Sequence, residues 1–127
     1  ICLGMQMLFE RSFEYGEHQG LGLLKGQVIP MAGLLPKDLK IPHMGWNALD
    51  VVKSDGKLFA NTKEGAYVYF VHSYYAECDK KDIIATSDYG MEFTAAVQKE
   101  NVYGCQFHPE KSGETGLKIL KSFCEAN

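Results

Sequence analysis

The chain has 127 residues, of which 46% are hydrophobic and 23% are charged, and its formal net charge is −3. This length corresponds to one domain, and the composition is typical of an ordinary globular protein. A small negative charge offers no electrostatic basis for binding nucleic acid or an acidic membrane. No apolar run approaches the ~20 residues that span a bilayer, so we expect neither nucleic acid nor a membrane among the partners.

The chain has four widely separated cysteines, Cys2, Cys78, Cys105 and Cys124, and no CxxC pair. A zinc site is therefore disfavoured, and we expect no metal and no cofactor. A chain with this much core material has no need of a disulfide framework, and no signal peptide is visible. We expect a cytoplasmic protein in which Cys105 and Cys124 act as small buried hydrophobes.

The first predicted element is a helix over residues 3–14. The sequence places Leu3, Met7, Leu8 and Phe13 near one face at helical spacing. The glycine-rich residues that follow are expected to end this helix and form a loop.

The middle of the chain reads as a series of strands, and the end as a helix. Alternating, β-branched and aromatic residues predict strands within 24–32, 43–52, 66–71, 82–90, 92–101 and 102–108. A helix is predicted over 113–125, with Leu117, Leu120 and Cys124 on one face. Strands that follow each other this closely favour an α/β fold with a mixed, partly antiparallel sheet and helices at the chain ends.

The start of the chain has the pattern of a nucleophile elbow, in which a strand stops, one residue turns sharply and a helix begins. Cys2 occupies the turn, and Gly4 is expected to let the backbone pass closely. The Leu3 N–H can stabilise an oxyanion, and a helix N-terminus is expected to lower the pKa of the Cys2 thiol. The alternative is that Cys2 is a small buried residue at a strand end.

A matching base lies near the end of the last predicted strand. His108 is followed by Pro109, which cannot continue a ladder, and by Glu110. We expect the turn to fold back so that Glu110 meets one ring nitrogen of His108 and the other nitrogen faces a thiol. Cys2, His108 and Glu110 would then form a nucleophile, a base and a group that orients the base. The alternative is a surface histidine beside a surface glutamate.

Four segments in this order, "CLGMQ", "PHMGWN", "YFVHSY" and "QFHPEKS", carry a family resemblance. The chain closely resembles, over essentially all of its length, the glutaminase subunits of imidazole glycerol phosphate synthases. These subunits are class I (triad) glutamine amidotransferases. The resemblance implies a three-layer, flavodoxin-like α/β fold, here incomplete. Residues 1–127 would be the C-terminal portion of the amidotransferase domain, starting at the elbow, with the N-terminal part absent.

The resemblance also implies an activity, the hydrolysis of L-glutamine to glutamate and ammonia through Cys2, His108 and Glu110. The substrate-binding positions that it implies are Leu3, Gln6, Glu14, His72, Ser73 and Tyr74. The stretch 72–74 would contact the substrate carboxylate largely through its backbone. The alternatives are structural: Glu14 would be a solvated charge at a helix end, and His72 would be a histidine at a strand end whose ring is hydrogen-bonded to a neighbour.

The partner implied by the resemblance is a synthase (cyclase) subunit with a (β/α)₈ barrel, forming a heterodimer. Ammonia would pass into this barrel, which makes imidazole glycerol phosphate and AICAR in histidine biosynthesis. The interface would include Met44, Trp46, Asn47 and Lys111. The alternative for Trp46 is that it belongs to the hydrophobic core. The rival functions are an inactive truncated fragment of such a subunit, another class I amidotransferase, or another hydrolase with a cysteine elbow.

Overall fold

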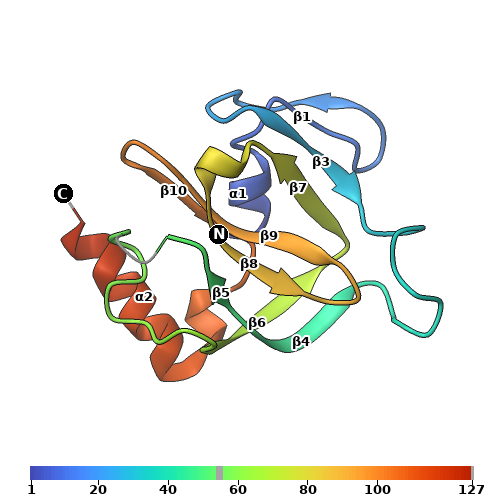
Figure 1. Cartoon of the computed structure of the whole chain (residues 1–127). Helices are drawn as coiled ribbons and strands as arrows, with labels where there is room; N and C mark the ends of the chain where they lie inside the picture. The colour runs from blue at the N-terminus through green and yellow to red at the C-terminus, as the bar shows by residue number, and fades with distance from the viewer. Residues whose placement is uncertain (54–55, 127) are drawn as a thin grey trace.

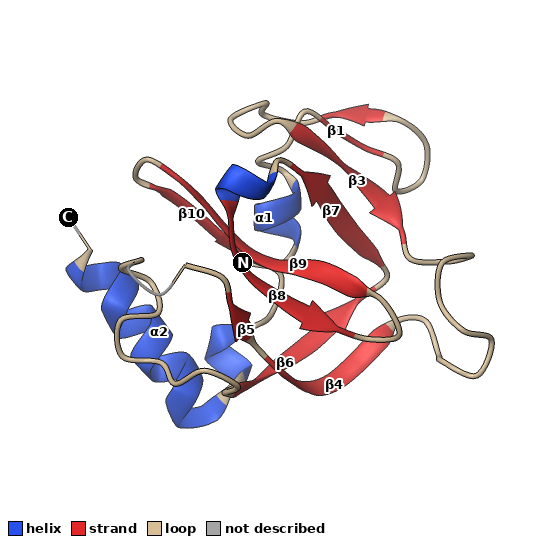
Figure 2. Cartoon of the chain, viewed as in Figure 1, coloured by secondary structure: helices blue, strands red, loops and turns tan. Residues whose placement is uncertain are grey.

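The computed structural model describes residues 1–53 and 56–126. The elements follow one another as α1 (Leu3–Gln6), β1 (Arg11–Ser12), β2 (His18–Gln19), β3 (Gly26–Pro30), β4 (His43–Ala48), β5 (Asp50–Val51), β6 (Tyr67–His72), β7 (Tyr74–Cys78), the 3-10 helix η1 (Lys80–Asp82), β8 (Ile83–Asp88), β9 (Glu92–Lys99), β10 (Val102–Cys105), the 3-10 helix η2 (Pro109–Lys111) and α2 (Gly113–Glu125). The α/β character predicted from the sequence is confirmed, with α1 and α2 near the two ends of the described chain (Figure 2).

The strands form three hydrogen-bonded ladders. Their orders are β2–β1–β3–β7, β10–β9–β8–β5 and β4–β6. Strand β1 pairs with β3 in parallel, and the other pairings among the described residues are antiparallel. In Figure 1 the ladder with β1, β3 and β7 lies on one side of the molecule and α2 on the other, and β8, β9 and β10 run between them.

Most of the predicted elements are present. The predicted strands contain β3, β4 with β5, β8, β9 and β10 within shorter bounds, whereas β6 is shifted by one residue from the predicted range 66–71, and the predicted C-terminal helix is α2. Strand β7 was not predicted, because its sequence follows β6 after a single residue and lacks a turn signal of glycine or proline. It pairs along its whole length with β3, a strand that lies far from it in the sequence.

The prediction of a helix over residues 3–14 is wrong beyond Gln6. The next backbone carbonyls bond to a distant loop, since Met7 O accepts from the Leu21 N–H, at 2.9 Å, and Leu8 O from Leu23, at 2.9 Å. The predicted face is also wrong, because Met7 is exposed whereas Met5 is fully buried. Tertiary hydrogen bonds therefore end α1 after a little more than one turn.

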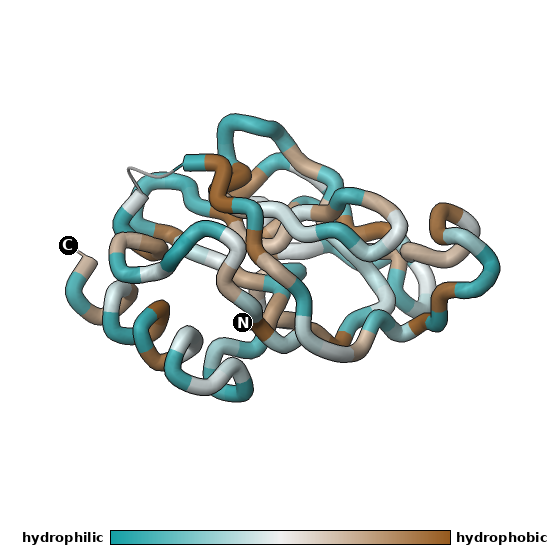
Figure 3. Tube along the Cα trace, turned by 60° about the horizontal axis from the view of Figure 1, so that its bottom comes forward, coloured by the Kyte–Doolittle hydropathy of each residue, from teal (hydrophilic) through white to brown (hydrophobic). Residues whose placement is uncertain are grey.

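Helix α2 has the predicted length but buries a different face. Ile119 is buried, whereas Leu117 and Cys124 are exposed and Leu120 is half-buried. Hydrophilic and hydrophobic residues alternate along its turns beside the C-terminus (Figure 3). The prediction that Cys124 is buried is wrong, and the prediction that Cys105 is buried is confirmed.

Two close approaches, each at a glycine, bring α1 to the strand β10 and α2 to the 3-10 helix η2, the two segments next to the site. A Cβ on Gly104 of β10 would lie 2.9 Å from Met5 Cγ of α1. A Cβ on Gly116 of α2 would lie 1.8 Å from the Pro109 carbonyl oxygen of η2. Real side chains are not tolerated at such distances, so glycine allows α1 to pack on β10 and α2 to pack on η2. Gly4 has open space around it, so the expectation that Gly4 permits a close backbone approach is wrong.

Candidate active site

Cys2 occupies the sharp turn that the sequence predicts. Its φ of 51° and ψ of −109° are values that non-glycine residues rarely adopt, at a cost of about 1–3 kcal/mol. The turn is held by hydrogen bonds from the Cys2 N–H to the Cys105 carbonyl, at 2.7 Å, and from the Gly4 N–H to the Ile1 carbonyl, at 2.8 Å. The backbone therefore holds a strained residue at the start of α1, beside the end of β10.

The Cys2 sulfur lies among hydrogen-bonding groups of three segments. Its thiol faces the Val71 carbonyl of β6 at 3.9 Å, and the Gln106 amide donates to the sulfur from 3.6 Å. Burial raises the pKa of the Cys2 thiol, and the Leu3 N–H and the Gln106 amide only partly oppose this effect. The expectation of a lowered pKa is therefore wrong, because α1 has only four residues and desolvation outweighs its N-terminal dipole.

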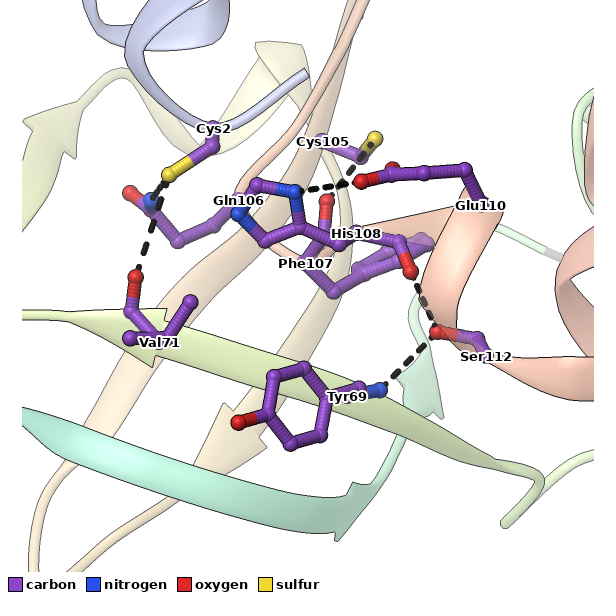
Figure 4. Close-up of polar contacts among 9 residues, drawn as sticks. All are labelled: Cys2, Tyr69, Val71, Cys105, Gln106, Phe107, His108, Glu110 and Ser112. Carbon is purple, nitrogen blue, oxygen red and sulfur yellow. Dashed lines mark hydrogen bonds and ion pairs between the residues drawn. The ribbon is translucent and has the colours of Figure 1, made fainter.

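The predicted contact between His108 and Glu110 is present. His108 Nδ1 lies 2.8 Å from Glu110 Oε2. Burial raises the pKa of Glu110, but the hydrogen bond to His108 and the nearby positive charges outweigh it and leave the pKa below its usual value. In Figure 4 the imidazole lies between Glu110 and the Cys2 sulfur, with Nδ1 toward the carboxylate. In the described structure the sulfur makes no hydrogen bond to this ring, although resting sites are often looser than reacting ones.

A hydrogen-bonded clasp on β6 holds the backbone of His108. The His108 N–H donates to the Tyr69 carbonyl at 2.9 Å. The Ser112 hydroxyl donates to the His108 carbonyl at 2.6 Å and accepts from the Tyr69 N–H at 2.9 Å. Ser112 thus connects the start of α2 to β6 (Figure 4). Both the N–H and the carbonyl of His108 are held in this way.

Three of the predicted substrate-binding residues line one cavity. Leu3, Gln6 and Glu14 border a space of about 200 Å³ beside α1. Glu14 was expected on a helix, but it lies after β1, where its N–H donates to the Ser12 hydroxyl at 3.3 Å. The amide of Gln6 is buried and bonds within the protein, to the Tyr74 carbonyl and to Gln106.

The other predicted substrate-binding residues lie where β6 passes into β7. His72 is 6% exposed, and its Nδ1 donates to the Tyr74 carbonyl at 2.9 Å. Its Nε2 lies 3.0 Å from Nδ1 of the buried His43. Burial lowers the pKa of His72 to about 4. The ring is therefore satisfied inside the protein, while the Ser73 carbonyl accepts from the Met31 N–H at 3.0 Å.

Three of the four predicted partner residues are exposed. Met44 and Trp46 of β4 are 60% and 52% exposed, so the alternative that Trp46 belongs to the core is wrong. Lys111 is also exposed and directly follows Glu110. Asn47 is half-buried and bonds to His43 Nε2 at 2.9 Å and to the Asp88 carbonyl at 2.7 Å.

Residues 1–126 match the family model "Glutamine amidotransferase class-I". The chain belongs to the class I glutamine amidotransferases. In the described residues of this amidotransferase chain we find no group of three or more histidine, cysteine, aspartate or glutamate side chains arranged to hold a metal ion. Across the same described ranges, none of its helices has the length and hydrophobicity needed to cross a membrane.

Its relatives include proteins named imidazole glycerol phosphate synthase subunit HisH. The subunit of Caldanaerobacter subterraneus subsp. tengcongensis is 56% identical over 126 residues, which are 98% of this chain and 60% of the relative. Those of Aquifex aeolicus and Methanocaldococcus jannaschii are both 50% identical, over 97% and 98% of this chain and 58% and 61% of their own length. The chain therefore spans about 60% of the length of the curated relatives it matches.

A solved structure shares the fold of this amidotransferase chain. It is a Thermoplasma acidophilum protein described as one of the subunits of a GMP synthase, with a TM-score of 0.56 and 21% sequence identity. The match covers 79% of this chain and 47% of the other.

Sequence reasoning missed two side chains of the site, Gln106 and Ser112. Gln106 lies within the segment "QFHPEKS". Its one available signal was its alternation with the apolar Cys105 and Phe107, which indicates that its side chain points to the opposite side of the strand from theirs. Ser112 directly precedes α2, a position that favours a helix cap, but its hydroxyl bonds across to β6 instead.

Proposed function

We propose that the protein containing this chain hydrolyses L-glutamine to glutamate and ammonia, with Cys2 as nucleophile, His108 as acid and base, and Glu110 as the group that orients His108. The observation that carries this proposal is the 2.8 Å contact between His108 Nδ1 and Glu110 Oε2. It leaves Nε2 available to a thiol held on a strained elbow. The names and identities of the HisH relatives support the same reaction.

The proposed reaction begins when the Cys2 sulfur attacks the side-chain carbonyl carbon of glutamine and its proton passes to His108 Nε2. The Leu3 N–H, which lies against the sulfur, faces the oxyanion that forms. The carbon–nitrogen bond then breaks as the imidazolium gives its proton to the leaving ammonia. A water molecule next gives a proton to His108 and attacks the thioester, the carbon–sulfur bond breaks, and glutamate leaves as His108 returns the proton to the sulfur and restores the thiol.

Within the proposal, glutamine occupies the cavity beside α1. Glu14 lines this cavity together with Leu3 and Gln6 of α1, and a carboxylate can pair with the α-ammonium group of the substrate. His72 ends the strand whose Val71 carbonyl reaches the sulfur, and Ser73 and Tyr74 come directly after it. Its backbone is therefore near enough to contribute to substrate binding.

The proposal includes a synthase subunit with a (β/α)₈ barrel as heterodimer partner, to which ammonia is passed. A docking face of Met44 and Trp46 of β4 with Tyr69 and Val71 of β6 supports it, because these residues pair across the ladder and share one side. Exposed aromatic residues and methionine are enriched at interfaces. The Val71 carbonyl of the same strand contacts the Cys2 sulfur, so this face borders the site. The proposal also includes a lyase reaction for the complete synthase and a cytoplasmic location, both resting on the resemblance to these relatives.

A glutamine-like electrophile, 6-diazo-5-oxo-L-norleucine, tests the proposed reaction. We expect mass spectrometry to find one adduct on Cys2, formation of which is slowed by excess glutamine and is absent from Cys2→Ala. Labelling of Cys2 that glutamine does not slow would instead indicate another hydrolase with a cysteine elbow. Absence of labelling in the folded chain and in its complex with the synthase subunit would indicate an inactive fragment.

A further inference from the structure

Gln106 is a buried polar side chain with 0% exposure, immediately after β10. Burying an amide costs free energy unless its donors and acceptors are paired. The structure pairs it twice, since Oε1 accepts from the Gln6 amide at 3.1 Å and Nε2 donates to the Cys2 sulfur from 3.6 Å. The side chain therefore bridges Gln6 of helix α1 and the nucleophile, and Figure 4 shows its contact with the Cys2 sulfur.

The direction of these hydrogen bonds is determined by a backbone carbonyl. The Tyr74 carbonyl can only accept, so the Gln6 side chain must turn its NH₂ group toward it, at 3.4 Å. The same NH₂ group faces Gln106, which must therefore present its oxygen to Gln6 and its own NH₂ group to Cys2. The His72 Nδ1 donates to the same carbonyl at 2.9 Å and helps to hold it in place.

Two of the polar contacts of the sulfur have opposite effects on its protonation. The Val71 carbonyl accepts from the neutral thiol, so it favours the protonated form. The Gln106 amide donates to the sulfur, so it favours the thiolate. Because burial also favours the neutral thiol, the thiolate depends on donors such as this amide.

We propose that Gln106 is a further catalytic residue of this site, whose Nε2–H group holds the Cys2 sulfur and stabilises its thiolate. In the step concerned, the sulfur–hydrogen bond breaks, its electron pair stays on sulfur, and the proton passes to His108 Nε2. An amide suits this role because it supplies a donor without a charge, whereas a carboxylate at the same position would repel the thiolate. The catalytic role rests on the proposed glutaminase function, but the effect on the thiol does not.

The test is the rate at which iodoacetamide alkylates Cys2 between pH 6 and pH 11, followed by mass spectrometry of the Cys2 peptide. Gln106→Met keeps an unbranched side chain of similar size and removes the donor. We expect it to raise the midpoint of the pH profile by about one unit and to slow alkylation at pH 7 about tenfold, since hydrogen bonds to charged groups are strong. Gln106→Glu should slow it at least as much.

The matched control is Gln98→Met, because Gln98 lies on the neighbouring strand β9 and bonds to the Glu100 carbonyl and the Tyr103 hydroxyl, away from the sulfur. We expect it to leave the Cys2 profile unchanged. If Gln106→Met does not fold, as judged by circular dichroism, Gln6→Met provides the second variant. It frees the Gln106 amide to rotate and should slow alkylation by a smaller factor.

An unchanged profile in folded Gln106→Met, or in Gln6→Met if that variant has to replace it, would overturn the proposal. This readout needs neither glutamine nor turnover, so its failure is distinct from failure of the glutaminase function. Slow alkylation of Gln106→Met together with labelling that glutamine does not block would support the role of Gln106 and reject the proposed substrate.

Discussion

The clasp made by Ser112 gives a prediction whose size can be worked out from the structure. Ser112 is 2% exposed, and its hydroxyl bonds to the His108 carbonyl and the Tyr69 N–H. In Ser112→Ala the His108 carbonyl keeps its bond from the Lys111 N–H, at 3.0 Å, whereas the Tyr69 N–H loses its acceptor. An unsatisfied donor costs about 1–3 kcal/mol, so we expect a loss of about 2 kcal/mol in the free energy of unfolding.

Urea unfolding followed by circular dichroism measures this loss. With a slope of roughly 1–2 kcal/mol per M, a loss of about 2 kcal/mol lowers the midpoint by about 1–2 M. The matched control is Ser122→Ala on α2, which removes a single hydrogen bond from the Asn61 amide, at 3.2 Å. We expect this control to lose about 0.5–1 kcal/mol.

The same substitution has a second expected effect, on the site itself. Because the clasp holds the backbone of His108, Ser112→Ala should slow labelling of Cys2 by the glutamine-like electrophile, whereas Ser122→Ala should not. If Ser112→Ala loses no more stability than Ser122→Ala and labels at the normal rate, the reasoning that the clasp positions the imidazole is refuted.

Three further predictions concern pH, packing and the docking face. Because the folded pKa of His72 is about 4 against an ordinary 6.5, the unfolded chain takes up this proton first on acidification. Stability should therefore fall between pH 6.5 and pH 4, by up to about 3 kcal/mol, and urea unfolding of His72→Gln should show a weaker decline. Gly116→Ala should destabilise the protein by about 1–3 kcal/mol, because its Cβ would meet the Pro109 carbonyl, whereas Gly4→Ala, in open space, should be neutral or stabilising by thermal unfolding. Trp46→Ala should leave the unfolding midpoint nearly unchanged but weaken calorimetric binding to the synthase subunit by about 2 kcal/mol or more, and unchanged binding would remove Trp46 from the docking face.

Patterns that depend on neighbouring residues were readable from the sequence alone. Helix α2, most of the strands and the turn at Cys2 follow from spacing and turn chemistry within a few residues. The contact between His108 and Glu110 also spans only two positions, with a proline between them that restricts the backbone. Family membership follows from segments that keep their order along the chain.

Features that depend on distant partners were decided by the tertiary structure. Helix α1 ends early because the carbonyls of Met7 and Leu8 bond to a loop more than ten residues away, and the same folding moves Glu14 off the helix. The pKa of Cys2 rises because burial, a property of the whole fold, outweighs the effect of a single helical turn. Gln106 shows its role only once folding brings its amide to a sulfur 104 positions earlier in the chain, since no local pattern encodes such a contact.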